Sequence, residues 1–219
     1  MKTKTRFAWK QFLKNLAIIA IPVALQNMLT TTGSMIDTMM IAPLGETTVG
    51  AVGLCAQFSS LMFAGYWGFF GGGMLFFSQY WGAQDDDGID HSYGLTLSCM
   101  MIVGLTFGAF AIFAPETVMK LYTDKESIQV IGAEYLRIIG FGYPVQAFSM
   151  AMSALLRSTE RVRIPLFASI ASVASNIFLN WVFIYGKFGL PEMGVRGAAL
   201  ASDAFFPFDD CVKACAEAG

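Results

Sequence analysis

The sequence predicts an all-α, polytopic membrane protein, because of its composition and the spacing of its apolar runs. Of the 219 residues, 55% are hydrophobic and 14% are charged, against roughly 25% charged residues in an average soluble domain. The mean hydropathy is +0.56. Apolar runs of about 20 residues, the length that crosses a bilayer as a helix, recur along the chain. This composition excludes a disordered chain, which needs low hydrophobicity and high charge.

Five of these runs are long enough to be complete transmembrane helices, and a sixth is incomplete. We expect the complete helices over residues 16–41, 49–80, 93–113, 128–156 and 164–185. The sixth begins near Gly194 and loses its apolar character after Ser202. The connections are short, so consecutive helices should lie antiparallel. The chain therefore divides into a basic N-terminal arm (1–15), a helical region (16–202) and a C-terminal tail (203–219).

The distribution of lysine and arginine predicts that the N-terminus lies in the cytoplasm. Eight of these residues stand in the arm and in the loop after the fourth helix, and four stand on the opposite side. Cytoplasmic loops carry the excess of basic residues, and acidic residues weigh little in this rule. We therefore keep this orientation although the run 85–91, on the cytoplasmic side, is acidic rather than basic. We expect this run to be a solvated loop rather than a divalent-cation site.

The first helix carries polar residues within its apolar run. Asn27, Thr31 and Ser34 recur at three- and four-residue spacing, which predicts one polar stripe lining a cavity, with Asp37 on its flank. A carboxylate at the centre of a membrane helix costs roughly 2.5–3.5 kcal/mol on insertion scales. Two interpretations of Asp37 stay open: a hydrated acid near the outer interface, or a proton or cation site. Pro22 predicts a kink or hinge in the same helix.

Other helices contribute further polar residues to the expected cavity. Asn176 and Asn180 stand four apart in the fifth helix, where their amides either coordinate an ion or hydrogen-bond a neighbouring helix. We expect the cavity to be lined also by Gln57, Gln146 and Ser172. Other pairings and positions are predicted as well: Glu134 with Arg137, Arg157 at the cytoplasmic end of its helix, and the aromatic residues Tyr66, Trp67, Phe69 and Phe70 either facing lipid or lining a route for flat organic cations.

The sequence lacks the residue patterns of an enzyme. His91 is the only histidine, so no Ser/His/Asp triad can form, and there is no Walker-type glycine loop. Cys211 and Cys215 lack the further ligands of a zinc site. The net charge of −2 argues against a nucleic-acid partner. We expect no metal and no organic cofactor.

The chain from about Leu13 to Ser202 resembles the N-terminal half of MATE (multidrug and toxic compound extrusion) transporters. Three stretches carry the resemblance: Pro22 with residues 34–37 (SMID) and 44–45 (LG), residues 78–83 (SQYWGA), and residues 176–180 (NIFLN) with 190–202 (LPEMGVRGAALAS). The chain departs from the family at residues 156–161, where the usual glycines are missing, and after Ser202. The end of the chain suggests a truncation, with a C-lobe or a second copy required for function.

The resemblance implies a fold of two six-helix lobes in the cytoplasmic membrane, of which this chain is the N-lobe. It implies export of drugs or organic cations in exchange for H⁺ or Na⁺, with Asp37, Asn176 and Asn180 as the cation-coupling residues. Two alternatives stay open. One is a truncated, non-transporting fragment or membrane interaction partner, and the other is a lipid-linked oligosaccharide flippase.

Overall fold

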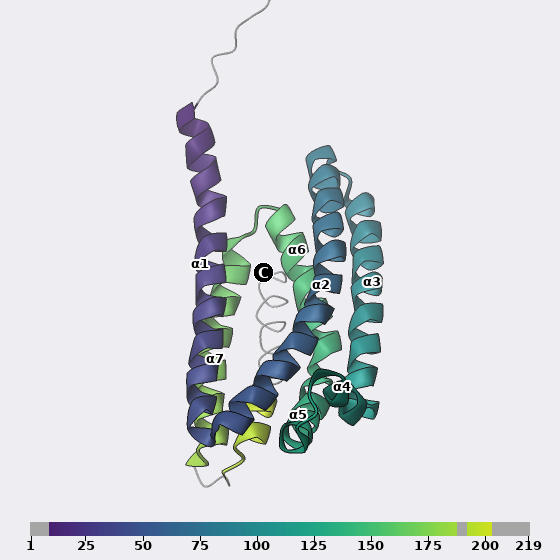
Figure 1. The fold of residues 1–219 in the computed structure, drawn as a ribbon. Helices are drawn as coiled ribbons and strands as arrows, with labels where there is room; N and C mark the ends of the chain where they lie inside the picture. Colours follow the sequence, from purple (N-terminus) through teal and green to yellow (C-terminus); the bar gives the residue numbers. More distant parts are fainter. Residues whose placement is uncertain (1–8, 188–191, 203–219) are drawn as a thin grey trace, which may run out of the picture.

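A computed structural model describes residues 9–187 and 192–202 of the chain. The helices are α1 (Trp9–Ile41), α2 (Glu46–Ala83), α3 (Asp86–Phe113), α4 (Pro115–Tyr122), α5 (Glu126–Ile139), α6 (Gly142–Ser158) and α7 (Arg163–Ile184), with a 3₁₀ turn, η1 (Ala42–Leu44), after α1. Residues 195–202 are also helical. Within the described ranges there is no strand, and the all-α prediction is confirmed (Figure 1).

By length and apolar composition, the described part of the chain has five units that can span a membrane when a bent pair of helices counts as one, as the apolar runs predicted. Four are the single helices α1, α2, α3 and α7, and the fifth is the pair α5 and α6. The prediction of one continuous helix over 128–156 is wrong, because α5 and α6 meet at an angle of 51°. The bend has a cause in the sequence: Pro144 has no N–H to donate to the carbonyl of Gly140 four residues earlier.

Two local expectations also differ from the structure, and one short helix was not expected. Residues 9–15, assigned to the arm, are the first turns of α1. The acidic run is not a loop: Asp85 caps α3, with Oδ1 accepting a hydrogen bond from the backbone N–H of Gly88 at 3.0 Å. The short helix α4 was not predicted, although Pro115 at its first turn is a known start pattern. Residues 1–8 of the arm, and the tail 203–219 with Cys211 and Cys215, lie outside the described residues.

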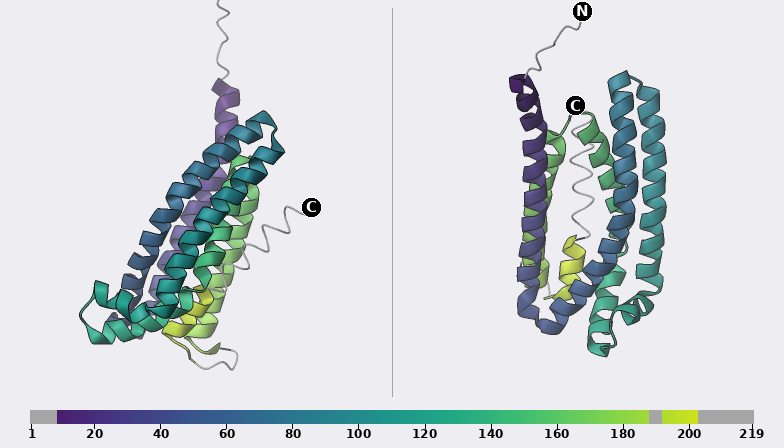
Figure 2. Two further views of the ribbon diagram at one scale, coloured as in Figure 1. Left: turned by 90° about the vertical axis from the view of Figure 1, so that its right-hand side faces the viewer. Right: turned by 45° about the horizontal axis from the view of Figure 1, so that its top comes forward.

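The long helices form two groups that diverge from the turn η1 (Figures 1 and 2). One group is the α1/α7 pair, in which the two helices pack along each other. The other is the α2/α3/α5/α6 bundle, which also carries α4. The two groups touch at few positions: near η1, where Ile41, Ile184 and Ala198 form a small buried cluster, and between α6 and the α1/α7 pair.

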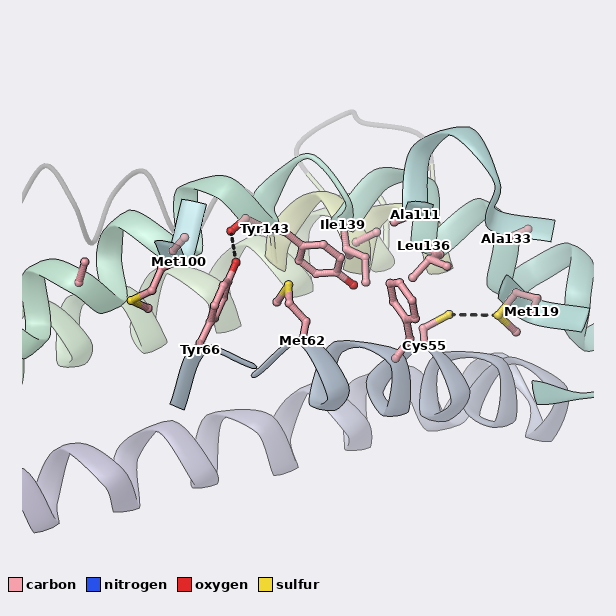
Figure 3. Packing of buried hydrophobic residues seen from close by; sticks show 14 residues of the cluster. Cys55, Met62, Tyr66, Met100, Ala111, Met119, Ala133, Leu136, Ile139 and Tyr143 are labelled. Atoms are coloured by element: carbon pink, nitrogen blue, oxygen red, sulfur yellow. Dashed lines mark hydrogen bonds between the residues drawn. The ribbon is translucent and has the colours of Figure 1, made fainter. Parts of the chain in front are cut away.

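The α2/α3/α5/α6 bundle holds the main apolar core (Figure 3). Cys55 donates its thiol proton to the carbonyl of Gly132 at 3.3 Å, beside the sulfur of Met119 at 3.8 Å. Tyr66 donates its hydroxyl proton to the carbonyl of Tyr143 at 3.0 Å, so the buried Tyr66 hydroxyl is hydrogen-bonded within this core. The core therefore ties α2 to both halves of the bent α5–α6 pair.

Small residues allow α3 to approach that bend closely. A Cβ placed on Gly108 would lie 2.9 Å from the carbonyl oxygen of Gly140, and one on Gly104 would lie 2.5 Å from the Tyr66 hydroxyl. Glycine at these positions lets helix backbones come together, as small residues do in membrane interfaces. The direction of α6 is therefore set by its packing on α3 and by the bend.

Candidate functional site

A cavity of about 520 Å³ lies between the α1/α7 pair and the α2/α3/α5/α6 bundle. This volume is within the range of roughly 300–1,000 Å³ that small-molecule sites occupy. Its lining comes from α1, α2, α6 and α7, and from Ser202. Many of the lining side chains are polar, in a part of the molecule made of apolar helices: Gln26, Asn27, Thr30, Ser34, Asp37, Gln146, Ser149, Ser153, Arg157, Ser169 and Asn176.

The face that α1 turns to this cavity is rotated relative to the predicted stripe. Its members include Gln26, Thr30, Gly33 and Asp37, again at three- and four-residue spacing, with Asn27 and Ser34 beside them. Asp37 therefore lies within the lining stripe rather than on its flank. Gln26, which the sequence analysis missed, follows the same helical period as Thr30 and Asp37.

Gln146 lies in the lining as expected, but three predicted residues lie elsewhere. Thr31 is exposed, and its hydroxyl donates to the carbonyl of Asn27 at 2.9 Å. Gln57 is exposed on α2, on a different face from the lining residues Phe63 and Trp67. Ser172 is fully buried in α7, next to the lining stripe that contains Val173. α1 continues through Pro22 as one helix, so the hinge stays a prediction.

An aromatic wall from α2 closes one side of the cavity. Phe63, Trp67 and Phe70 line it, and the rings of Trp67 and Phe70 meet edge to face at a centroid distance of 5.4 Å. Tyr66 belongs to the core instead, and Phe69 is 43% exposed. Of the four aromatic residues, Trp67 and Phe70 therefore line the cavity, whereas Tyr66 and Phe69 do not.

The Asp37 cluster, defined as Asp37, Asn176 and Asn180, joins α1 to α7 at one end of the cavity. Asn180 Nδ2 donates to Asp37 Oδ1 at 2.8 Å and to Asn176 Oδ1 at 3.1 Å. Both asparagines are buried, and Asp37 is half-buried. The terminal atom of Asn176 that faces Asp37 lies 2.7 Å from Oδ1 and 3.3 Å from Oδ2. Three polar atoms thus form a triangle in which each is within hydrogen-bond distance of the other two.

The three contacts of this triangle cannot all be hydrogen bonds when Asp37 is ionised. A carboxylate oxygen only accepts, so each amide should turn its NH₂ toward Asp37. If both amides do so, their two NH₂ groups face each other at 3.1 Å, and if one amide is reversed, its oxygen faces the carboxylate. Asn180 Oδ1 is in addition buried without a hydrogen-bond partner in the described part of the chain. A bound proton or cation removes the conflict.

The Arg157 network occupies the other end of the cavity. Arg157 Nη2 donates to Gln26 Oε1 at 2.8 Å, and Gln26 Nε2 donates to Ser169 Oγ at 2.8 Å, so this network joins α6, α1 and α7. Gln26 and Asp37 are separated by eleven positions on α1, about 16 Å along a helix axis. Arg157 lies in the cavity lining as well as near the end of α6.

Glu134 and Arg137, expected to pair with each other, have different surroundings. Glu134 forms an ion pair with Arg196, and both side chains are well exposed. The pairing differs because the fold brings Arg196, in the helical residues 195–202, next to Glu134 of α5, which the linear sequence does not indicate. A second, charged pocket lies on α4 and α5, away from the central cavity, and its lining includes Glu134, Arg137 and Arg196.

Comparisons with known proteins agree with this fold. The MatE family model matches residues 22–182. The chain is 25% identical over 190 residues to the probable multidrug resistance protein YoeA of Bacillus subtilis, and 26% identical over 207 residues to the probable multidrug resistance protein NorM of Neisseria meningitidis. These matches cover 86% and 93% of this chain but 41% and 45% of the relatives. The chain therefore spans about half the length of these relatives.

Solved structures share the arrangement of helices. A crystal structure of MATE in the bent conformation matches with a TM-score of 0.81 and 23% identity, over 92% of this chain and 44% of that one. A transporter of the MOP superfamily from Pyrococcus furiosus matches with a TM-score of 0.80 and 22% identity, over 91% and 43%. At this identity the likeness shows the fold alone. The family match identifies the chain as a multi-pass membrane protein related to transporters and not to enzymes: it belongs to the MatE family.

Proposed function

We propose that this chain is the N-lobe of an exporter that moves drugs or other small organic cations out of the cell in exchange for H⁺ or Na⁺. Residues 16–202 form the lobe, preceded by the basic arm 1–15 and followed by the tail 203–219. The relatives are named multidrug resistance proteins, which supports small organic substrates. The cavity supports them too, because it is lined both by the aromatic wall of α2 and by the polar face of α1 that includes Asp37.

The observation that carries the cation coupling is the triangle of the Asp37 cluster. A proton on Asp37 Oδ1 is donated to Asn176 Oδ1, 2.7 Å away, while Asn180 Nδ2 donates to both oxygens. Every contact of the triangle is then a hydrogen bond. A Na⁺ ion acts in an equivalent way, because carboxylate and amide oxygens are ligands for hard cations. The orphaned Asn180 Oδ1 is a further oxygen available to it.

Coupling follows if the ion and the solute favour different conformations of the lobe. Binding of the cation strengthens the α1–α7 contact at Asp37, and Pro22 in α1 allows that helix to change direction. A ligand shifts such an equilibrium only by its difference in affinity for the two states. A cation that stabilises a closed cavity therefore expels an organic solute that needs an open one.

The orientation proposed here places the N-terminus in the cytoplasm and the protein in the cytoplasmic membrane. Basic residues are in excess in the arm and in the loop between α6 and α7, as the positive-inside rule requires of cytoplasmic segments. The Arg157 network then lies toward the cytoplasm, and the Asp37 cluster lies toward the outside.

A flux measurement tests this function. The purified chain is reconstituted in liposomes at several copies per liposome, so that a second copy can complete the transporter. A pH or Na⁺ gradient is imposed, and the movement of ethidium against its own gradient is followed by fluorescence. We expect gradient-driven flux that Asp37→Asn reduces to the level of protein-free liposomes. Asp90→Asn is the matched control, because Asp90 is an exposed acid in the first turns of α3.

The outcomes of that measurement separate the hypotheses. Flux that is unchanged by Asp37→Asn would show that the coupling role of Asp37 is wrong. An unmodified chain that gives no gradient-driven flux favours the other hypothesis, a non-transporting fragment or an interaction partner in the membrane.

A further inference from the structure

Arg157 is a cationic group in a cavity proposed to take cations, and within the described part of the chain its charge lacks a counter-ion. Among the residues described, its guanidinium forms no ion pair, and its buried Nε has no hydrogen-bond partner. Gln26 accepts one hydrogen bond from Nη2, but a neutral amide does not balance a charge. A guanidinium withdrawn from water is costly unless it is paired. The C-terminal end of α6 offsets part of the charge, yet no carbonyl there accepts from Nε.

The surroundings of Arg157 have the parts of an anion site beside an aromatic surface. Gln26 is itself held by Ser169, so the guanidinium is fixed between α6 and α1. The Arg157 Cζ atom lies 6.0 Å from the ring centroid of Phe70, in the aromatic wall. A guanidinium presents N–H groups in a planar fork that matches the two oxygens of a carboxylate.

We propose that Arg157 binds the carboxylate of amphoteric aromatic solutes, which carry a cationic and an anionic group on one molecule. The aromatic body of the solute packs on Phe70 and Trp67. The cavity is then bipolar, with a carboxylate acceptor at the Arg157 end and the single acid Asp37, among its described lining residues, about 16 Å away along α1. This inference rests on the proposed function only in taking the cavity as a solute site.

A matched pair of dyes tests the subsite by binding alone, without a gradient. Tetramethylrhodamine carries a carboxylate, and its methyl ester carries the same cationic ring system without that charge. Binding of each to the whole chain in phosphatidylcholine nanodiscs is followed by fluorescence anisotropy. We expect Arg157→Gln to weaken binding of the acid about tenfold, the effect of one lost charge-assisted contact, and to change binding of the ester by less than about twofold.

Two variants serve as controls. Arg161→Gln removes an arginine that is exposed four residues further on, and it should leave both affinities unchanged. Arg157→Lys keeps the charge but loses the planar fork, and it should give an intermediate loss for the acid alone. Equal losses for both dyes in Arg157→Gln, or no loss for either, overturn the proposal.

A competition on the unmodified chain is independent of how the variants fold. Benzoate should displace the acid dye, and methyl benzoate should not. Failure of benzoate to displace it overturns the proposal. Because binding needs no ion gradient, absence of flux with intact selectivity for the acid dye counts against the proposed export and not against the subsite.

The anion could come from other sources, and two arms distinguish them. Phosphatidylglycerol is added to the nanodiscs: loss of acid-dye binding in the unmodified chain, but not in Arg157→Gln, assigns the site to a lipid headgroup. The double variant Asp209→Asn with Asp210→Asn removes acids of the tail, and a gain of about tenfold or more in acid-dye affinity assigns the site to the chain itself. Either result overturns the solute proposal, and unchanged binding in both supports it.

Discussion

The two ends of the cavity solve the same problem, a charge among membrane helices, in different ways. At the Arg157 end, the Gln26 amide has a partner for each terminal atom: its oxygen accepts from Arg157 and its nitrogen donates to Ser169. At the Asp37 end, two buried amides and an ionised carboxylate always leave one contact in which two donors or two acceptors face each other. The amide geometry is thus complete at one end and incomplete at the other. An incomplete network is the one that responds to a small ion.

The largest change in the free energy of unfolding is expected from Gly108→Ala, which disturbs the packing of α3 that supports α6. The added methyl group meets the carbonyl oxygen of Gly140 at 2.9 Å, and neither backbone can yield easily. Overpacking of this kind costs about 1–3 kcal/mol in free energy of unfolding, measured by denaturant titration in mixed micelles. Gly68→Ala is the control, since nothing lies within 4 Å of its added Cβ. Equal stability of the two variants would show that α3 does not support the bend.

Next in size is Gln26→Leu, which breaks the Arg157 end. The substitution removes two hydrogen bonds and leaves the guanidinium with a further unpaired N–H. We expect a loss of about 1–2 kcal/mol in free energy of unfolding, since interhelical hydrogen bonds in membranes contribute less than similar bonds to charges elsewhere. Gln57→Leu, at an exposed glutamine of α2, should change stability by less than about 0.5 kcal/mol. An unchanged free energy of unfolding in Gln26→Leu would contradict the stabilising role of this network.

Substitution of Asp37 is expected to raise the free energy of unfolding, whereas the two preceding substitutions lower it. In Asp37→Asn the introduced oxygen, at the Oδ1 position, can still accept from Asn180 Nδ2, and the introduced NH₂, at the Oδ2 position, lies 3.3 Å from the Asn176 terminal atom and can donate to Asn176 Oδ1. The free energy of unfolding should rise by about 1 kcal/mol, the value of one net hydrogen bond, while Asp90→Asn leaves it unchanged. Destabilisation by Asp37→Asn would mean that the ionised carboxylate is already well paired, and that the two ends do not differ as described.

The smallest effect is expected at the ion pair outside the cavity. Glu134 and Arg196 are both well exposed, and exposed pairs contribute little because water and salt screen them. Glu134→Gln should leave the midpoint of the same denaturant titration within its error at low and at high salt. A clear loss at low salt would show that residues 195–202 are held by this pair rather than by the apolar packing of Ala198 with Ile41 and Ile184.

Much of the fold was visible in the sequence, because it depends on length and hydropathy. Each complete apolar run corresponds to a unit that can span a membrane, and the C-terminal ends of α3 and α7, at Phe113 and Ile184, lie within a residue of prediction. The bend at Gly140 was missed although Pro144 marks it, since a proline inside an apolar run is compatible with several geometries. The helix α4 was missed because it is too short for a hydropathy window.

The sequence by itself determined that Asp37, Asn176 and Asn180 are polar residues within membrane helices, and that Asn176 and Asn180 share one face of α7. Only the tertiary structure decided that Asp37 meets them, that Gln26 and not Thr31 faces the cavity, and that Arg157 joins the lining. The physical reason is that helical periodicity fixes which residues share a face, but not which way that face turns. That rotation is set by packing between residues more than a hundred positions apart, such as Gly33 against Val173 and Gln26 against Arg157.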